Sequence, residues 1–173
     1  AGELNIAFDH PLYKGQLGHM FGASSSKVTT QADAVLIVGT YVFPEVYPYF
    51  ENVFAPGAKV VHIDLNAYEI AKNFPVDLGV VADPKATLKL LITALGRKQT
   101  DGDRQAARAR AAQSSSDNKA ALDRQLDHDR QFSTATPLHA SRFMEELAKH
   151  VPADVMIFDE ALTTSPDLTR YLV

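Results

Sequence analysis

Residues 32–64 read ADAVLIVGTYVFPEVYPYFENVFAPGAKVVHID, and they contain two short apolar runs at 34–38 and 60–63. Each run is rich in valine or isoleucine and does not alternate with polar residues, which is typical of strands buried on both faces of a parallel sheet. The first run is followed by Gly39 and the second by Asp64. Because parallel sheets bind ligands at the carboxyl ends of their strands, this stretch predicts a ligand-facing edge.

Gly39 and Asp64 are therefore candidate nucleotide-binding residues. An aspartate at the end of a strand can accept hydrogen bonds from ribose hydroxyls, or it can cap the following turn with its own side chain. His62, inside the second run, is expected to be a packed core residue rather than a base. The loop at 41–56 is rich in aromatic residues and prolines; it is expected either to pin its rings onto the core or to form a pocket wall.

The next segment predicts a third strand at 77–82 and then a helix. Asp83 suits the cap position and Pro84 the first turn. The residues at 88, 91, 92 and 95 are leucine or isoleucine at helical spacing, so one face should be buried, and Gly96 should end the helix. With a short helix expected at 24–31, the pattern predicts an α/β fold class: a three-layer, Rossmann-like parallel sheet.

The composition changes at Arg97. Residues 97–136 are polar and predict a linker of two exposed helical pieces, broken at 113–118, with the His128 cluster (Asp127 to Asp129) in solvent. Residues 137–173 predict a helix from Thr136-Pro137, a fourth strand at 155–158 and a helix from Ser165. The predicted domains are thus 1–96, 97–136 and 137–173, the last a truncated α/β unit.

The bulk composition excludes several classes of function. The chain has 173 residues, a formal net charge of -4 and no cysteine. It has no basic patch for nucleic acid, no apolar run long enough for a membrane span and no thiolate for a metal or a nucleophile. Its six histidines lack ligand spacing, so no metal site is expected. A cytoplasmic protein is expected. Since the sequence opens at Ala1, we expect a fragment whose natural start lies upstream.

A hydroxyl cluster, Thr163-Thr164-Ser165, directly precedes the last predicted helix. Such a cluster can bind phosphate through hydroxyl and backbone N–H groups. It can equally serve only to cap the helix, which requires one of the three residues.

Several segments, in order and spacing, resemble the thiamine-diphosphate-dependent enzymes of the acetolactate synthase and benzoylformate decarboxylase group. They look like the second half of that family's central domain. Residues 137–173 are similar to the opening of its pyrophosphate-binding domain, and residues 159–165 (DEALTTS) look most like the benzoylformate decarboxylase branch. The central-domain stretches are 10–15 (HPLYKG), 32–39 (ADAVLIVG), 54–64 (FAPGAKVVHID), 68–73 (YEIAKN), 75–77 (PVD) and 83–91.

The resemblance implies an enzyme that uses thiamine diphosphate and Mg²⁺ on a 2-oxo acid substrate, with the cofactor as the electron sink during decarboxylation. By position it makes Glu160, Thr163 and Thr164 the candidate cofactor-binding residues. It also implies that the parent enzyme is a homodimer or a homotetramer.

The sequence departs from the family in ways that matter for activity. The GDG motif for magnesium and diphosphate, the amino-terminal domain and half of the central domain are absent, so we expect an internal piece that is inactive alone. Where benzoylformate decarboxylases carry a catalytic histidine, this chain has Val46, and its ionisable neighbour Glu45 is the one catalytic candidate. Flavin-binding relatives tend to have an arginine where this chain has Thr40 and Tyr41, so FAD is not expected.

Three functions therefore stay open. The first is a decarboxylase or carboligase of the benzoylformate decarboxylase type, which we expect. The second is an acetolactate-synthase-like ligase. The third is a non-catalytic central domain that binds FAD or ADP near Gly39 and Asp64, or that braces an oligomer.

Overall fold

A computed structural model describes residues 6–7, 9–15, 17, 22–42, 47, 51–161 and 163–172. The described residues fall into two compact units. The first lies within residues 14–104, and the second combines residues from 4–13 with those from 105 onward. Among the described helices, none has both the length and the apolar character needed to cross a bilayer.

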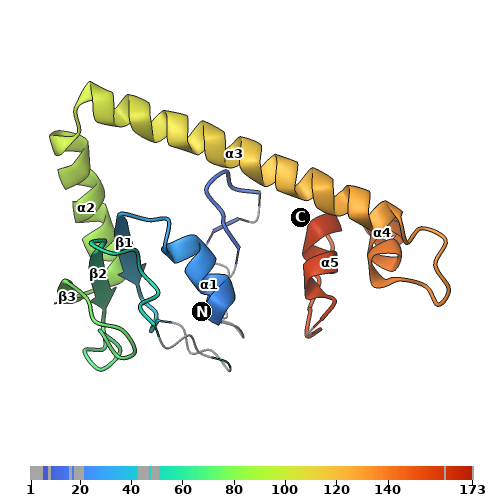
Figure 1. The fold of residues 1–173 in the computed structure, drawn as a ribbon, viewed down its shortest axis with the longest axis horizontal. Helices are drawn as coiled ribbons and strands as arrows, with labels where there is room; N and C mark the ends of the chain where they lie inside the picture. The colour runs from blue at the N-terminus through green and yellow to red at the C-terminus, as the bar shows by residue number, and fades with distance from the viewer. Residues whose placement is uncertain are drawn as a thin grey trace. The chain divides into compact units, whose positions relative to one another are not determined.

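The first unit is built on a parallel sheet of three strands in the order β1 (Ala34–Val38), β2 (Lys59–Asp64) and β3 (Leu78–Val81) (Figure 1). Val35 lies opposite Val60, and His62 lies opposite Gly79. The three predicted strands are confirmed, and so is the α/β fold class.

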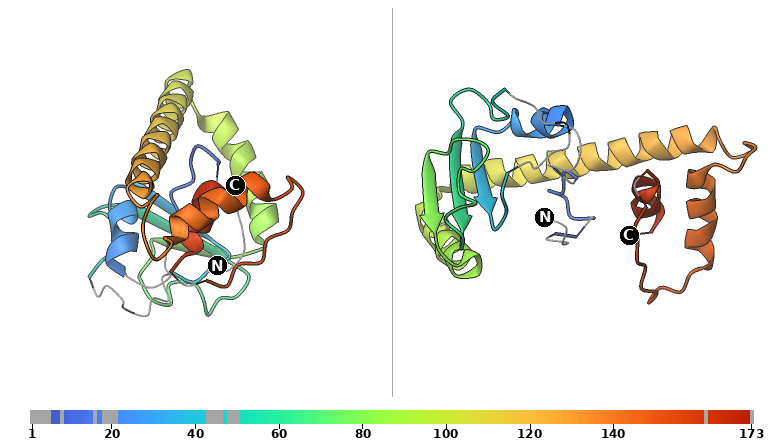
Figure 2. Two further views of the ribbon diagram at one scale, coloured as in Figure 1. Left: turned by 90° about the vertical axis from the view of Figure 1, so that its right-hand side faces the viewer. Right: turned by 90° about the horizontal axis from the view of Figure 1, so that it is seen from below.

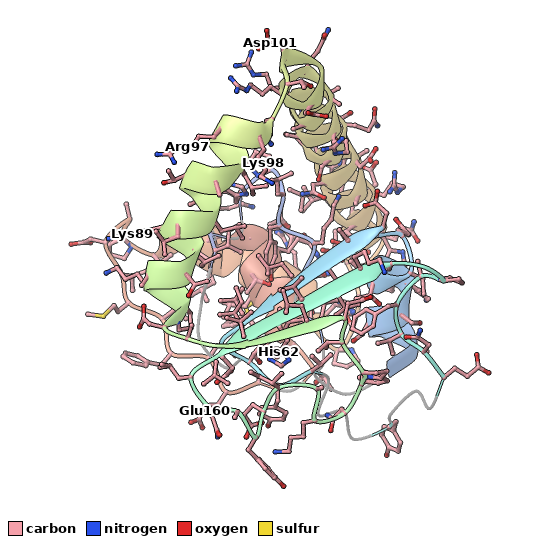
Figure 3. The ribbon with its side chains drawn as sticks, turned by 90° about the vertical axis from the view of Figure 1, so that its left-hand side faces the viewer. His62, Lys89, Arg97, Lys98, Asp101 and Glu160 are labelled. Carbon is pink, nitrogen blue, oxygen red and sulfur yellow. The ribbon has the colours of Figure 1, made fainter. Side chains whose placement is uncertain are left out.

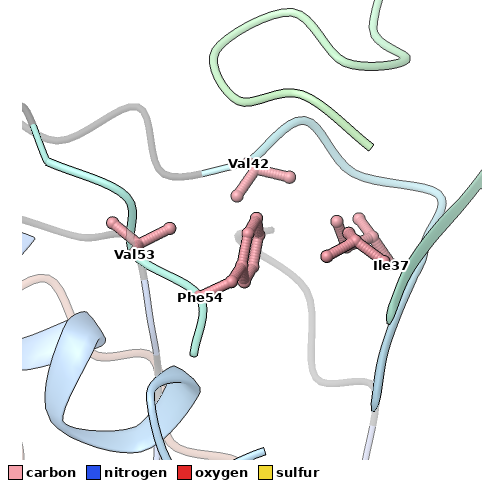
Figure 4. Close-up of a cluster of buried hydrophobic side chains, with 5 residues drawn as sticks. Ile37, Val42, Val53 and Phe54 are labelled. Carbon is pink, nitrogen blue, oxygen red and sulfur yellow. The ribbon is translucent and has the colours of Figure 1, made fainter. Parts of the chain in front are cut away.

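One face of this sheet carries the buried core. Ile37 and Val60 lie on it, and Val42, Val53 and Phe54 from the loop between β1 and β2 pack against them (Figure 4). Each such side chain contributes about 1.5–3 kcal/mol through the apolar surface that it removes from water. These three loop side chains therefore cover part of this face of the sheet.

The segment between β2 and β3 closes over the same face. His62 is completely buried, on the side of the sheet away from α2 (Figure 3), which confirms that it is a core residue. Its Nδ1 accepts a hydrogen bond from the Ala71 N–H at 3.4 Å. Asn73 donates to the Val42 carbonyl at 2.6 Å, so this segment is tied to the loop after β1.

Helix α1 (Gly22–Thr29) precedes β1, close to the predicted 24–31, and helix α2 (Pro84–Lys98) follows β3. Asp83 caps α2 by accepting from the Ala86 N–H at 2.7 Å, as predicted. The predicted end at Gly96 was wrong, because the backbone continues to a cap at Gln99. The predicted apolar face is only partly covered: Ile92 is 69% exposed and Leu95 47%, since no described element packs on that side.

Helix α3 (Asp101–Arg130) is one continuous helix of 30 residues, so the predicted break at 113–118 was wrong (Figure 2). Two polar residues of that stretch, Ser114 and Asn118, do not compete with the helix backbone, because their side chains bond to carbonyl groups elsewhere in the chain. Ser114 donates to the Pro11 carbonyl at 2.8 Å, and Asn118 donates to the Pro11 and Tyr13 carbonyls at 3.1 and 2.9 Å. Alanine and arginine supply the helix propensity.

The second unit ends with helices α4 (Ala140–His150) and α5 (Ser165–Tyr171). α4 begins later than Thr136-Pro137 predicted, with His139 as its cap. The predicted strand at 155–158 was wrong: these residues form no strand, and Met156 and Phe158 are 83% and 90% exposed. A strand needs a hydrogen-bonded neighbour, and the described residues of this unit provide none.

Candidate functional site

The carboxyl edge of the sheet brings together Gly39, Asp64 and the start of α2. Gly39 has a φ of 63°, and its N–H donates to the Ile63 carbonyl at 2.9 Å. A Cβ added at Gly39 would lie 3.8 Å from Cγ of Pro84. The end of β1 is therefore next to the first turn of α2, which is where doubly wound α/β folds bind ligands.

The Asp64 side chain is used locally in this structure. The residue is 8% exposed, and Oδ1 accepts a hydrogen bond from the Asn66 N–H at 2.7 Å. Of the two roles considered for Asp64, this geometry is that of the turn cap. Contact with a ribose stays a prediction.

A lysine between two aromatic rings lies in the segment that follows β2. The Lys72 ammonium is 5.1 Å from the centre of the Tyr41 ring and 4.6 Å from that of Tyr68. It also pairs with Glu69 at 3.3 Å. This cation–π arrangement fixes Tyr41, the first residue of the aromatic loop, against the segment after β2.

The second group of candidates lies in the other unit, on the segment between α4 and α5. Glu160 and Thr163 are exposed, and Glu160 is labelled in Figure 3. Thr164 is half-buried, and although it occupies the cap position of α5, its side chain makes no cap hydrogen bond. The Thr164 hydroxyl is thus not used in capping and can donate to an oxyanion.

Asp159 stabilises the shape of this segment. The Ser165 hydroxyl and the Ala161 N–H hydrogen bond to its carboxylate and hold its pKa below the usual range. The bond from Ala161 is 2.9 Å long. An ionised Asp159 therefore ties Ala161 and Ser165 together within the segment that carries Glu160 and the two threonines.

Glu45 lies outside the described residues. The remaining candidates form two groups, Gly39 with Asp64 in the first unit and Glu160 with the threonines in the second. Among the residues that the structure describes, no three His, Asp or Glu side chains are placed to hold a metal ion.

Sequence reasoning missed a buried charge cluster around Asp129. We expected the residues around His128 to be exposed, but Asp129 is only 8% exposed. Its carboxylate pairs with Arg170 and accepts a hydrogen bond from the Tyr171 hydroxyl at 2.9 Å. Burial, followed by the bond to Asp129, raises the pKa of Tyr171 to about 12. No local sequence pattern links residues so far apart, so only the fold could reveal this cluster.

A cavity of about 510 Å³ lies beside this cluster, between the end of α3 and helices α4 and α5. Its basic side chains already have acidic partners. Arg142 pairs with Glu145 and Glu146, and Lys149 pairs with the same two residues. The cavity therefore offers little unbalanced positive charge for an anion.

Comparison with known proteins identifies the family. Residues 1–91 match the family described as "Thiamine pyrophosphate enzyme, central domain". The chain is 34% identical over 112 residues to a sulfoacetaldehyde acetyltransferase of Rhodobacter capsulatus, which covers 62% of this chain and 19% of that protein. It is 34% identical over 87 residues to a probable acetolactate synthase large subunit of Methanocaldococcus jannaschii, covering 50% of this chain and 15% of that subunit.

A more distant relative extends the match into the second unit. The sulfoacetaldehyde acetyltransferase of Alcaligenes xylosoxydans xylosoxydans is 26% identical over 168 residues, which cover 86% of this chain and 28% of that enzyme. The chain thus spans less than a third of the length of each of these relatives. The family match covers more than half of the chain, and it agrees with the parallel sheet that the structure shows. The chain belongs to the thiamine pyrophosphate enzyme family, and residues 1–91 match its central domain.

Proposed function

We propose that this chain is an internal part of a larger thiamine-diphosphate-dependent enzyme, a decarboxylase or carboligase of 2-oxo acids. The match of residues 1–91 to the family's central domain is the observation that carries the proposal. The relatives are named as a synthase and acetyltransferases, which favours the branch that transfers an acyl group to an acceptor. A benzoylformate-decarboxylase-like enzyme is the alternative, supported by the sequence at 159–165.

The residues between α4 and α5 suit the diphosphate end of the cofactor. Thr163 is exposed and the Thr164 hydroxyl is not used in capping, so two hydroxyl donors are available for phosphate oxygens. We propose that both donate to the diphosphate, and that Glu160 lies on the substrate side. When bound, the cofactor supplies the electron sink that decarboxylation requires.

The described residues do not suit the metal. A bound Mg²⁺ needs carboxylate or carbonyl oxygens in octahedral geometry, and the described part of the chain has no acidic cluster for it. We propose that ligands outside this sequence hold the magnesium ion. The exposed apolar side chains of α2, Leu90, Ile92 and Leu95, support the proposal that this chain is part of a larger protein, which would cover them.

Activity assays of the full-length protein separate the two enzyme branches. With pyruvate, a carboligase should form acetolactate or transfer an acetyl group to an added acceptor. With benzoylformate, a decarboxylase should release benzaldehyde. Turnover of pyruvate without benzaldehyde formation from benzoylformate supports the first branch. Benzaldehyde formation without carboligation supports the second. If neither pyruvate nor benzoylformate is consumed in the presence of thiamine diphosphate and Mg²⁺, the proposal is contradicted.

We further propose that the enzyme acts in the cytoplasm as a homodimer or homotetramer.

A second candidate function is nucleotide binding without catalysis. It is favoured by one observation, that Gly39, Asp64 and the start of α2 share the carboxyl edge of the sheet. Titration calorimetry of the 173-residue chain with ADP, FAD and NAD tests it. Saturable heat with any of the three supports binding at this edge if Gly39→Val removes it, and the absence of heat with all three excludes it.

A further inference from the structure

Asp129 joins the end of α3 to α5 through buried contacts. The Asp129 side chain is 7% exposed, and it pairs with Arg170, whose side chain is 12% exposed. The Tyr171 hydroxyl donates to Oδ2 of Asp129 at 2.9 Å. Arg170 also pairs with Asp167, on its own helix, at 3.1 Å. One carboxylate from α3 therefore holds the last turn of α5 through two adjacent side chains.

These contacts help to fix the end of α5 that lies against α3. The helix has only seven residues, and so short a helix is not stable by itself in water. It depends on its tertiary contacts, which include the Asp129 cluster, the buried side chain of Leu168 and its packing against α4. Removing one partner of a buried ion pair is costly, because the other charge stays buried without compensation.

The opposite end of α5 carries the candidate cofactor residues. Thr163 and Thr164 directly precede Ser165, where the helix begins. Seven helical residues span about 10 Å. A tilt of about 15° at the anchored end would therefore displace the first turn by roughly 2–3 Å, more than a binding constellation tolerates.

We propose that Asp129 is a positioning residue for cofactor binding. Through Arg170 and Tyr171 it fixes the direction of α5, and so it holds the hydroxyls of Thr163 and Thr164 in place for the diphosphate. This inference rests on the proposed function, and it adds a residue from the long helix to the determinants of cofactor affinity.

The test compares Asp129→Asn with Asp127→Asn in the full-length protein. Asp127 is the matched control, because it lies on the last turn of the same helix and its side chain is 68% exposed in a pair with Arg130. We expect Asp129→Asn to raise the Kd for thiamine diphosphate, measured by calorimetry with Mg²⁺, about tenfold. At saturating cofactor kcat should fall by a smaller factor than the affinity does, because the bound cofactor holds the segment of Glu160, Thr163 and Thr164 in its working position. Asp127→Asn should change neither value.

Hydrogen–deuterium exchange of the 173-residue chain without cofactor gives an independent readout. Amides of α5 should exchange faster in Asp129→Asn than in wild type or Asp127→Asn. Should Asp129→Asn fail to fold, Tyr171→Phe carries the test, since it removes one hydrogen bond and keeps the ion pair. It should give a smaller change of the same sign.

The outcomes separate the role of Asp129 from cofactor binding itself. Normal binding by wild type with unchanged affinity in both Asp129→Asn and Tyr171→Phe overturns this inference and leaves the proposed function standing. Absence of cofactor binding by wild type overturns both. A parallel fall in kcat and affinity also overturns the inference, because it indicates general damage rather than a misplaced cofactor segment.

Discussion

Gly79 on β3 offers a sharp test of how the segment between β2 and β3 packs. A Cβ added at Gly79 would lie 2.6 Å from Cγ2 of Ile70 and 4.0 Å from its Cβ. Carbon atoms in contact normally lie about 3.5–4.0 Å apart, so the overlap is roughly 1 Å. Ile70 is branched at Cβ and cannot readily turn its methyl group away. Gly79→Ala should therefore destabilise the chain by about 1–3 kcal/mol, the usual cost of overpacking.

Urea unfolding of the 173-residue chain, followed by circular dichroism, measures this effect. Gly96→Ala is the control, because a Cβ at Gly96 meets nothing within 4 Å. Gly96 lies inside α2, so alanine there should stabilise by about 0.5–1 kcal/mol. The same substitution should thus lower the urea midpoint at one glycine and raise it at the other.

A second substitution isolates the contact. Ile70→Leu moves the branch point from Cβ to Cγ, and it removes the methyl group that a new Cβ on β3 would meet. The double variant, Gly79→Ala with Ile70→Leu, should recover at least about 1 kcal/mol relative to the sum of the single changes. If Gly79→Ala is neutral or stabilising, or if Ile70→Leu gives no recovery, Ile70 does not pack on β3 as described.

Three further predictions concern charged and ionisable groups. Asp83→Ala should destabilise the chain by about 1 kcal/mol through loss of the α2 cap, whereas Asp83→Ser should retain most of the stability. Equal midpoints of thermal unfolding for Asp83→Ala and wild type would contradict this. Hydrogen bonds from the Val60 N–H and then from the Lys59 ammonium lower the pKa of Asp77. The stability that ionised Asp77 contributes is therefore present above its unfolded pKa of about 3.9 and is lost as the pH falls through the lower folded value. In urea unfolding between about pH 7 and 3, Asp77→Asn should make the stability less dependent on acid. Burial, followed by the bond to Asp129, raises the pKa of Tyr171 to about 12. Its phenol therefore stabilises the fold fully below its unfolded pKa of about 10, and this contribution is lost as the pH rises through the folded value. An ultraviolet titration should show a late-ionising tyrosine whose pKa falls in part in Asp129→Asn, and an unchanged titration would refute the contact.

The strands and the start of α2 could be predicted because their signals are local. The runs at 34–38 and 60–63 are themselves rich in valine and isoleucine, which is enough to predict buried strands. Asp83 and Pro84 mark the start of a helix within one turn. His62 could be placed in the core for the same reason, since it lies inside a run that is otherwise apolar. The candidate edge at Gly39 and Asp64 followed from the strand ends alone.

Features that depend on distant partners could not be predicted. The stretch at 113–118 looked like a helix break, but Ser114 and Asn118 find acceptors more than 100 residues away in the sequence. The apolar run at 155–158 looked like a strand, yet the described residues of its unit supply no neighbouring strand. Asp129 looked like one charge among many on a polar helix, and its burial depends on Arg170 and Tyr171 from a helix far along the chain.

Titration of the full-length protein with thiamine diphosphate in a calorimeter, with and without Mg²⁺, is the most direct test of the cofactor proposed for this protein. We expect saturable binding at one site per subunit that requires Mg²⁺ and that weakens when both Thr163 and Thr164 are replaced by valine. Absence of binding under both conditions would contradict the claim that this chain is part of a thiamine-diphosphate-dependent enzyme. Unchanged affinity in the double valine variant would contradict the place assigned to the diphosphate.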